Sequence, residues 1–143
     1  MMGATLPPMS TPEALLKTAL RHGFEAWSKS LPVSMTGAIC VALGQPQGLP
    51  DRYFGIPGKF AWIEAKAGVG KKVLKKASQI QKCSDLAACG QRVHVVWCEN
   101  LDLPPNYRQV VRYQVLPDRN YASEILYTWD TLSTDVFWGP VFA

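Results

Sequence analysis

The chain has 143 residues, of which 48% are hydrophobic and 18% charged, and its formal net charge is +4 at pH 7. This length is typical of one domain, and the apolar content is too high for an intrinsically disordered chain. No run approaches the roughly 18 consecutive apolar residues of a membrane span, and residues 1–10 lack the basic start and apolar core of a signal peptide. We therefore expect one cytoplasmic domain that does not contact a membrane.

The first predicted element is a helix that begins at the Thr-Pro-Glu motif of residues 11–13. Threonine caps helices, proline suits the first helical position, and glutamate complements the helix dipole. Leucine and alanine follow at helical spacing over residues 15–20. Gly23 is the predicted end of this helix, with a continuation through Trp27 as the alternative.

A strand and a hairpin are predicted next. The small, apolar composition of residues 34–43 favours a strand. Two further extended runs, Asp51–Phe54 and Phe60–Lys66, flank residues 55–59, which have the glycine and proline content of a hairpin connection. The hairpin matters because its register decides which polar side chains meet.

The length of the hairpin turn predicts that register. If the turn has four residues, Gly55 pairs with Phe60, and Asp51 lies directly opposite Glu64 with Cβ atoms about 5 Å apart. Side chains alternate along a strand, so Glu64 and Lys66 share one face and are separated by about 7 Å. One sheet face therefore carries two carboxylates and an ammonium.

The second half of the predicted core is a helix followed by a strand. Residues 71–89 have apolar side chains at helical spacing, and Gly90 is predicted to end the helix. The β-branched run of residues 92–97 predicts a buried central strand, in which His94 is a core residue rather than a catalytic one. The predicted order is helix, strand, hairpin, helix, strand.

Residues 99–143 differ in composition, because they hold eight of the fifteen aromatic residues and a charge of −3. Residues 103–113 begin with a proline pair and predict a short helix, which Pro117 would end. The rest is too aromatic for a free tail. We expect it to fold back onto the core or to form a subunit interface.

Positive charge is concentrated between Lys59 and Lys82, where seven lysines and one acid give +6, so the rest of the chain sums to −2. Such a strip is typical of a surface that binds a polyanion, although a solvated helix face would have the same composition. The side chains expected to contact phosphates are Lys71, Lys72, Lys75, Lys76, Lys82 and Arg52.

The two carboxylates and the lysine of the hairpin predict a reactive site. Two carboxylates held close together repel each other unless a cation or a proton lies between them, and their oxygens suit a hard metal such as Mg²⁺. With Lys66 beside them they can stabilise charge on a phosphate, which is the chemistry of phosphodiester hydrolysis. In the alternative, Asp51 starts a turn and Glu64 pairs with Lys66 or Arg52 on an exposed face.

These features together resemble a known nuclease family. Gly48–Arg52, Phe60–Lys66, the lysine-rich loop, the glutamine-bearing helix and the strand Arg92–Trp97 are similar to the VRR-NUC branch of the PD-(D/E)xK superfamily. The similarity covers about residues 12–97. It implies an α/β, restriction-endonuclease-like core with a central mixed sheet flanked by helices. It also implies Mg²⁺- or Mn²⁺-dependent DNA cleavage, with Holliday-junction resolvases among the relatives.

Position by position, the resemblance makes Asp51 and Glu64 metal ligands and Lys66 the catalytic lysine. Glu13 matches an acidic residue on the family's first helix, although glutamate is common at helix starts because of the dipole. We expect residues 1–98 to form the nuclease core and residues 99–143 an aromatic C-terminal extension.

The family also has a glutamine on the second helix, and two residues compete for that role. Counting back from Gly90 favours Gln79, whereas the string ASQIQ at residues 77–81 favours Gln81. Residues two apart on a helix point to different sides, so only one can face the site. We choose Gln79.

The predicted function is that of a metal-dependent DNA endonuclease in a bacterial or phage-infected cell. Nothing in the sequence suggests base reading, so we expect recognition of DNA shape such as a branch, flap or junction. A non-catalytic nucleic-acid-binding protein with the same fold is the alternative. A symmetric homodimer is a geometric expectation, because cutting two strands needs two sites.

Overall fold

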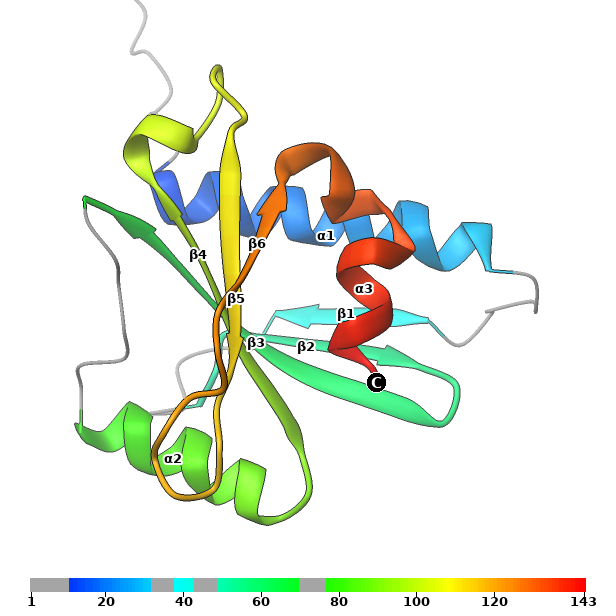
Figure 1. The fold of residues 1–143 in the computed structure, drawn as a ribbon. Coiled ribbons are helices and arrows are strands. Elements are labelled where there is room, and N and C mark those ends of the chain that lie inside the picture. The colour runs from blue at the N-terminus through cyan, green and yellow to red at the C-terminus, as the bar shows by residue number, and fades with distance from the viewer. Residues whose placement is uncertain (1–10, 32–37, 43–48, 70–76) are drawn as a thin grey trace, which may run out of the picture.

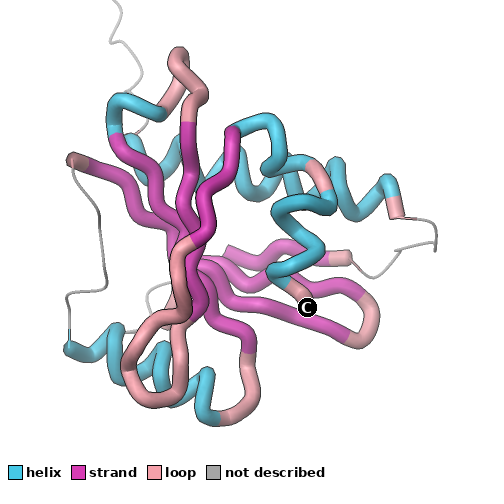
Figure 2. The backbone as a smooth tube through the Cα atoms, viewed as in Figure 1, coloured by secondary structure: helices cyan, strands magenta, loops and turns pink. Residues whose placement is uncertain are grey.

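The structure is a computed structural model, and it describes residues 11–31, 38–42, 49–69 and 77–143. The described strands form one six-stranded sheet in the order β1-β2-β3-β4-β5-β6 (Figures 1 and 2). The strands are β1 (Ile39–Ala42), β2 (Arg52–Ile56), β3 (Lys59–Gly68), β4 (Arg92–Glu99), β5 (Gln109–Gln114) and β6 (Ile125–Thr128). The helices are α1 (Pro12–Ser30), α2 (Ala77–Ala88) and α3 (Asp135–Val141), with 3-10 turns η1 (Asn100–Asp102) and η2 (Trp129–Ser133).

The sheet is mixed, and helices cover both of its faces. β3 and β4 are parallel, and every other neighbouring pair is antiparallel. α2 connects the two parallel strands and lies on one face, whereas α1, η2 and α3 lie on the other (Figure 1). The predicted α/β class with a central mixed sheet flanked by helices is confirmed.

Each face of the sheet has its own apolar core, as alternation along β4 requires. Val93 and Val95 pack with Cys83 of α2, whereas Val96 packs with Leu20 of α1. Buried on both faces, β4 is the predicted central strand, and His94 is a core residue with 1% exposure. Among the described residues, no helix combines the length and the apolarity needed to cross a membrane.

The first helix starts where predicted and ends later. Thr11 is the N-cap, and its hydroxyl accepts a hydrogen bond from the Ala14 amide at 3.2 Å. The helix passes through Gly23 to Ser30, so the predicted end at Gly23 is wrong and the continuation through Trp27 is correct. A Cβ on Gly23 would lie 1.9 Å from the carbonyl oxygen of Leu132. Gly23 therefore lets η2 pack closely on α1.

The hairpin between β2 and β3 has the predicted register. Gly55 pairs with Phe60 and Ile56 with Lys59, which leaves Pro57 and Gly58 at the tip of the turn. Gly58 has a φ of 81°, the left-handed conformation that this turn position requires. The turn therefore sets the position of every residue along both strands.

The remaining core predictions are met within the described residues. β1 falls inside the predicted strand of residues 34–43, of which 34–37 and 43 are not described. α2 ends just before Gly90, whose φ of 84° suits a helix end, but residues 71–76 of the predicted helix are not described.

The predicted helix at residues 103–113 is wrong, because most of its second half is strand β5. Val110 packs into the core on the α1 face and Val111 into the core on the α2 face. A strand can bury consecutive β-branched residues on opposite faces, and this tertiary gain outweighs the helix start suggested by the proline pair. β5 and β6 thus continue the sheet beyond β4.

The C-terminal aromatic residues pack on α1. The rings of Trp27 and Phe142 are stacked 5.6 Å apart, and those of Phe24 and Trp138 meet edge to face at 5.2 Å. The indole of Trp27 also donates a hydrogen bond to Asp135 at 3.2 Å. This segment covers the α1 face of the sheet, and a role at a subunit interface stays a prediction.

Candidate active site

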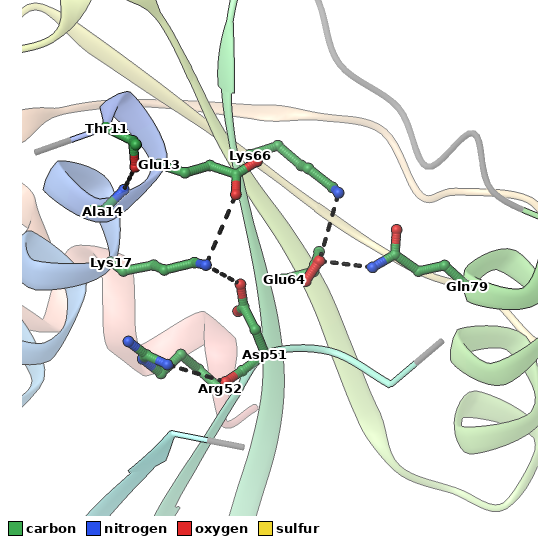
Figure 3. A network of polar contacts seen from close by, with 9 residues as sticks. All are labelled: Thr11, Glu13, Ala14, Lys17, Asp51, Arg52, Glu64, Lys66 and Gln79. Atoms are coloured by element: carbon green, nitrogen blue, oxygen red, sulfur yellow. Dashed lines mark hydrogen bonds and ion pairs between the residues drawn. The ribbon is translucent and has the colours of Figure 1, made fainter. Parts of the chain in front are cut away.

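The hairpin brings the two predicted carboxylates together between α1 and α2. Arg52 pairs with Ile63, so Asp51, one residue further out, lies alongside Glu64 (Figure 3). Glu64 and Lys66 project from β3 toward α2, while Ala65 between them faces the opposite core. The predicted cluster of two carboxylates and one ammonium is therefore present.

Glu64 is a buried carboxylate with two side-chain partners. It is only 5% exposed, and its Oε2 accepts a hydrogen bond from the Gln79 amide at 2.7 Å. The Lys66 ammonium lies 3.7 Å from the same oxygen. Burial and the nearby charge of Asp51 raise the pKa of Glu64 to about 7, although Lys66 and Gln79 oppose the rise. Placing a full negative charge here is costly, and a bound cation would offset that cost.

Asp51 has a cationic partner that the sequence did not suggest. Lys17 reaches from α1, and its Nζ lies 2.8 Å from Asp51 Oδ2 and 3.8 Å from Glu13 Oε2 (Figure 3). Burial acts to lower the pKa of Lys17, but the hydrogen bond and charge of Asp51 outweigh it, and the pKa is raised. The only sequence signal for Lys17 is its position one helical turn after Glu13.

The second oxygen of Asp51 is an unsatisfied acceptor. Oδ1 is buried and has no hydrogen-bond partner among the described residues. A buried polar atom without a partner costs free energy, and a carboxylate oxygen in that state is a ready ligand for a cation.

Of the two candidate glutamines, Gln79 faces the site. Its side chain is buried and contacts Glu64, whereas Gln81 is exposed and donates to Asp85 at 2.8 Å. Gln81 also accepts a hydrogen bond from Arg119. The separation follows from helix geometry, because residues two apart point to different sides.

The other predicted site residues make no direct contribution to the pair of carboxylates within the part of the chain that the structure describes. Glu13 Oε2 lies 3.8 Å from the Lys17 ammonium, which in turn contacts Asp51. Arg52 donates a hydrogen bond to the backbone carbonyl of Asp51 at 3.2 Å, and Lys82 is exposed on α2. Four predicted phosphate-contacting lysines lie outside the described residues: Lys71, Lys72, Lys75 and Lys76.

The donor set fits a divalent cation that keeps several ligands for water or substrate. The described part of the chain contains no group of three or more His, Cys, Asp or Glu side chains that could hold a metal alone. Mg²⁺ in phosphate-processing sites commonly takes one or two carboxylates, with waters and phosphate oxygens completing its octahedron. Asp51 and Glu64 supply such a pair, and the unsatisfied Oδ1 is a free oxygen ligand.

No family model matches the chain, and no curated protein is similar to it. Among solved structures, the chain is similar to that of Hjc from Archaeoglobus fulgidus, a Holliday junction resolvase from an archaeal hyperthermophile. The two chains are 14% identical, with a TM-score of 0.41, and the match covers 82% of this chain and 89% of that one. A similarity at this level transfers no residue role, so the chemistry of the site rests on its own geometry.

Proposed function

We propose that this protein is a metal-dependent DNA endonuclease of the PD-(D/E)xK type, with its catalytic machinery in residues 1–98. One observation carries the proposal: a buried carboxylate, Glu64, lies beside Asp51 and contacts both Lys66 and Gln79. A sheet that needed only stability would not bury one carboxylate beside a second, partly buried one, because their repulsion and desolvation oppose folding. Clustered groups of this kind are typical of functional sites.

Asp51 and Glu64 are the residues that would hold Mg²⁺ or Mn²⁺. When bound, a divalent cation supplies Lewis-acid stabilisation of phosphate charge and activation of water. Glu64 lies on β3 and Asp51 directly precedes β2, so the pairing of the two strands, which begins at Arg52 and Ile63, holds the two side chains near each other. That rigidity favours a preorganised electrostatic site, in which little reorganisation is needed when charge develops.

Lys66 and Gln79 have distinct roles in this mechanism. The Lys66 ammonium, on the same face as Glu64, neutralises negative charge on the phosphate oxygens and orients the attacking water. Gln79 does not react; it donates to Glu64 Oε2 and fixes the direction in which the carboxylate points. A neutral donor suits this task, because it positions the carboxylate without competing as a cation.

DNA binding is proposed to depend on the lysine-rich strip between Lys59 and Lys82. Of its later members, Lys82 is exposed on α2, the helix that also carries Gln79. Phosphate contacts of this kind give affinity and position without reading bases. We therefore propose selectivity for DNA structure, such as a branch, flap or junction, and a relation to the VRR-NUC branch of the superfamily.

The test is a panel of branched, nicked, single-stranded and linear DNA, incubated with the protein in Mg²⁺, in Mn²⁺ and in EDTA. Cleavage of at least one substrate with either metal, its loss in EDTA, and its loss in Glu64→Ala and Lys66→Ala would support the proposal. Unchanged cleavage by these variants would refute the site. Binding without cleavage by the wild type would favour a non-catalytic nucleic-acid-binding protein.

A further inference from the structure

Lys17 is the lysine of α1 that contacts the carboxylate cluster (Figure 3). It comes from the face of the sheet opposite to α2, the helix that carries Gln79. Its side chain is 24% exposed and that of Asp51 is 22% exposed, so their 2.8 Å ion pair is largely removed from solvent. A partly buried pair with this geometry is stronger than a surface salt bridge, which contributes little. The Lys17 ammonium is therefore held at Asp51, the carboxylate whose other oxygen has no hydrogen-bond partner among the described residues.

Each site carboxylate has a lysine of its own. Lys66 forms an ion pair with Glu64 Oε2, and Lys17 forms one with Asp51 Oδ2. Lys17 also has a second carboxylate within reach, because its Nζ lies 3.8 Å from Oε2 of Glu13, one helical turn away. A small change of side-chain rotamer would move the Lys17 ammonium fully onto Glu13, since residues four apart on a helix are neighbours.

We propose that Lys17 is an internal counter-cation. Its ammonium pairs with Asp51 when no divalent ion is bound, and it moves onto Glu13 when a divalent ion binds Asp51. The inference rests on the proposed function, because it concerns how the same site loads its metal. An ammonium in hydrogen-bond contact with Asp51 Oδ2 and a divalent cation on the same carboxylate repel each other. Binding of one therefore weakens the other.

This arrangement gives Glu13 a role that differs from the one suggested by the family resemblance. Glu13 acts as the second acceptor for Lys17, and their side chains already form an ion pair at 3.8 Å. The resting site is then close to charge-balanced, with one lysine for each carboxylate. The two lysines therefore offset the repulsion between the neighbouring carboxylates when no metal is bound. Asp51 Oδ1 stays free to become the first ligand of the metal ion.

The test is calorimetric titration of Mn²⁺ into the full chain without DNA, for the wild type, Lys17→Met and Lys17→Gln. Glutamine keeps a hydrogen-bond donor for Asp51 without the charge, so it tests the idea even if the methionine variant fails to fold. Lys29→Gln, at an exposed position on the same helix, is the matched control for net charge. Removing the competing charge-assisted bond should tighten Mn²⁺ binding about tenfold in both Lys17 variants and not in the control.

An Mn²⁺ affinity in Lys17→Gln equal to or weaker than that of the wild type would overturn the inference, as would the absence of Mn²⁺ binding in every variant. DNA cleavage by the wild type, measured separately, distinguishes this failure from failure of the proposed function. Cleavage with an unchanged affinity overturns the role of Lys17 alone. Tighter Mn²⁺ binding in Lys17→Gln without any cleavage overturns the nuclease and leaves the counter-cation supported.

Discussion

Glu64→Gln should make the metal-free protein more stable at neutral pH, and the gain should grow with pH. Glu64 is buried beside Asp51, and these two causes raise its pKa from 4.5 to about 7. The folded protein therefore binds the Glu64 proton more tightly than the unfolded chain does. Glutamine keeps an oxygen that can accept the bond from Gln79 but cannot ionise.

The size of the effect follows from the pKa. Below pH 4.5 the carboxyl group is neutral in both states and costs nothing. Between pH 4.5 and 7 it ionises in the unfolded chain first, so the stability that it contributes falls progressively and is lost above pH 7. The loss amounts to about 3 kcal/mol. For a chain of this length that corresponds to a difference in Tm of about 10 °C.

The assay is chemical denaturation in EDTA at a series of pH values from 4.5 to 8, for the wild type and Glu64→Gln. Glu25→Gln, at an exposed position on α1, is the control and should show no pH-dependent gain. Saturating Mg²⁺ should remove most of the difference, because a bound cation stabilises the ionised wild-type carboxylate. A gain that is absent, or equal at pH 4.5 and pH 8, would refute the description of Glu64 as a destabilised buried carboxylate.

Three further predictions concern α2 and α1. Gln79→Leu removes the 2.7 Å bond to the site carboxylate and should slow DNA cleavage roughly tenfold, whereas Gln81→Leu should leave the rate unchanged, as measured on a common substrate. Gly23→Ala places a methyl group 1.9 Å from a backbone oxygen of η2 and should destabilise the protein by about 2 kcal/mol in urea denaturation; a neutral result would refute the close packing. Lys82→Ala should lower the slope of log affinity for DNA against log salt by about one, and an unchanged slope would exclude a phosphate contact there.

The hairpin could be predicted from sequence because its geometry is local. A turn with Pro57 and Gly58 at its centre fixes the pairing on both sides, and that pairing alone brings Asp51 beside Glu64. The helix start at residues 11–13 was predictable for the same reason, since a cap depends on neighbours in sequence.

Features that depend on distant parts of the chain were missed. A glycine near the end of an apolar helical pattern predicts a helix end, but Gly23 instead allows the close approach of η2, which lies more than a hundred residues later in the chain. The sequence of strand β5 predicts a helix, because the two cores that bury Val110 and Val111 exist only once the sheet has formed. No sequence motif marks Lys17, and its contact with Asp51 depends on how α1 packs against the sheet.

The central claim is that Asp51, Glu64 and Lys66 form a metal-dependent phosphodiesterase site. The most direct measurement is the single-turnover cleavage rate of a branched DNA substrate at saturating protein with Mg²⁺, for the wild type, Glu64→Gln and Glu25→Gln. Because Glu64→Gln is expected to be the more stable protein, unfolding would not explain a loss of its activity. We predict at least a roughly hundredfold loss in Glu64→Gln and wild-type rates in Glu25→Gln. Cleavage by Glu64→Gln at the wild-type rate would contradict the account.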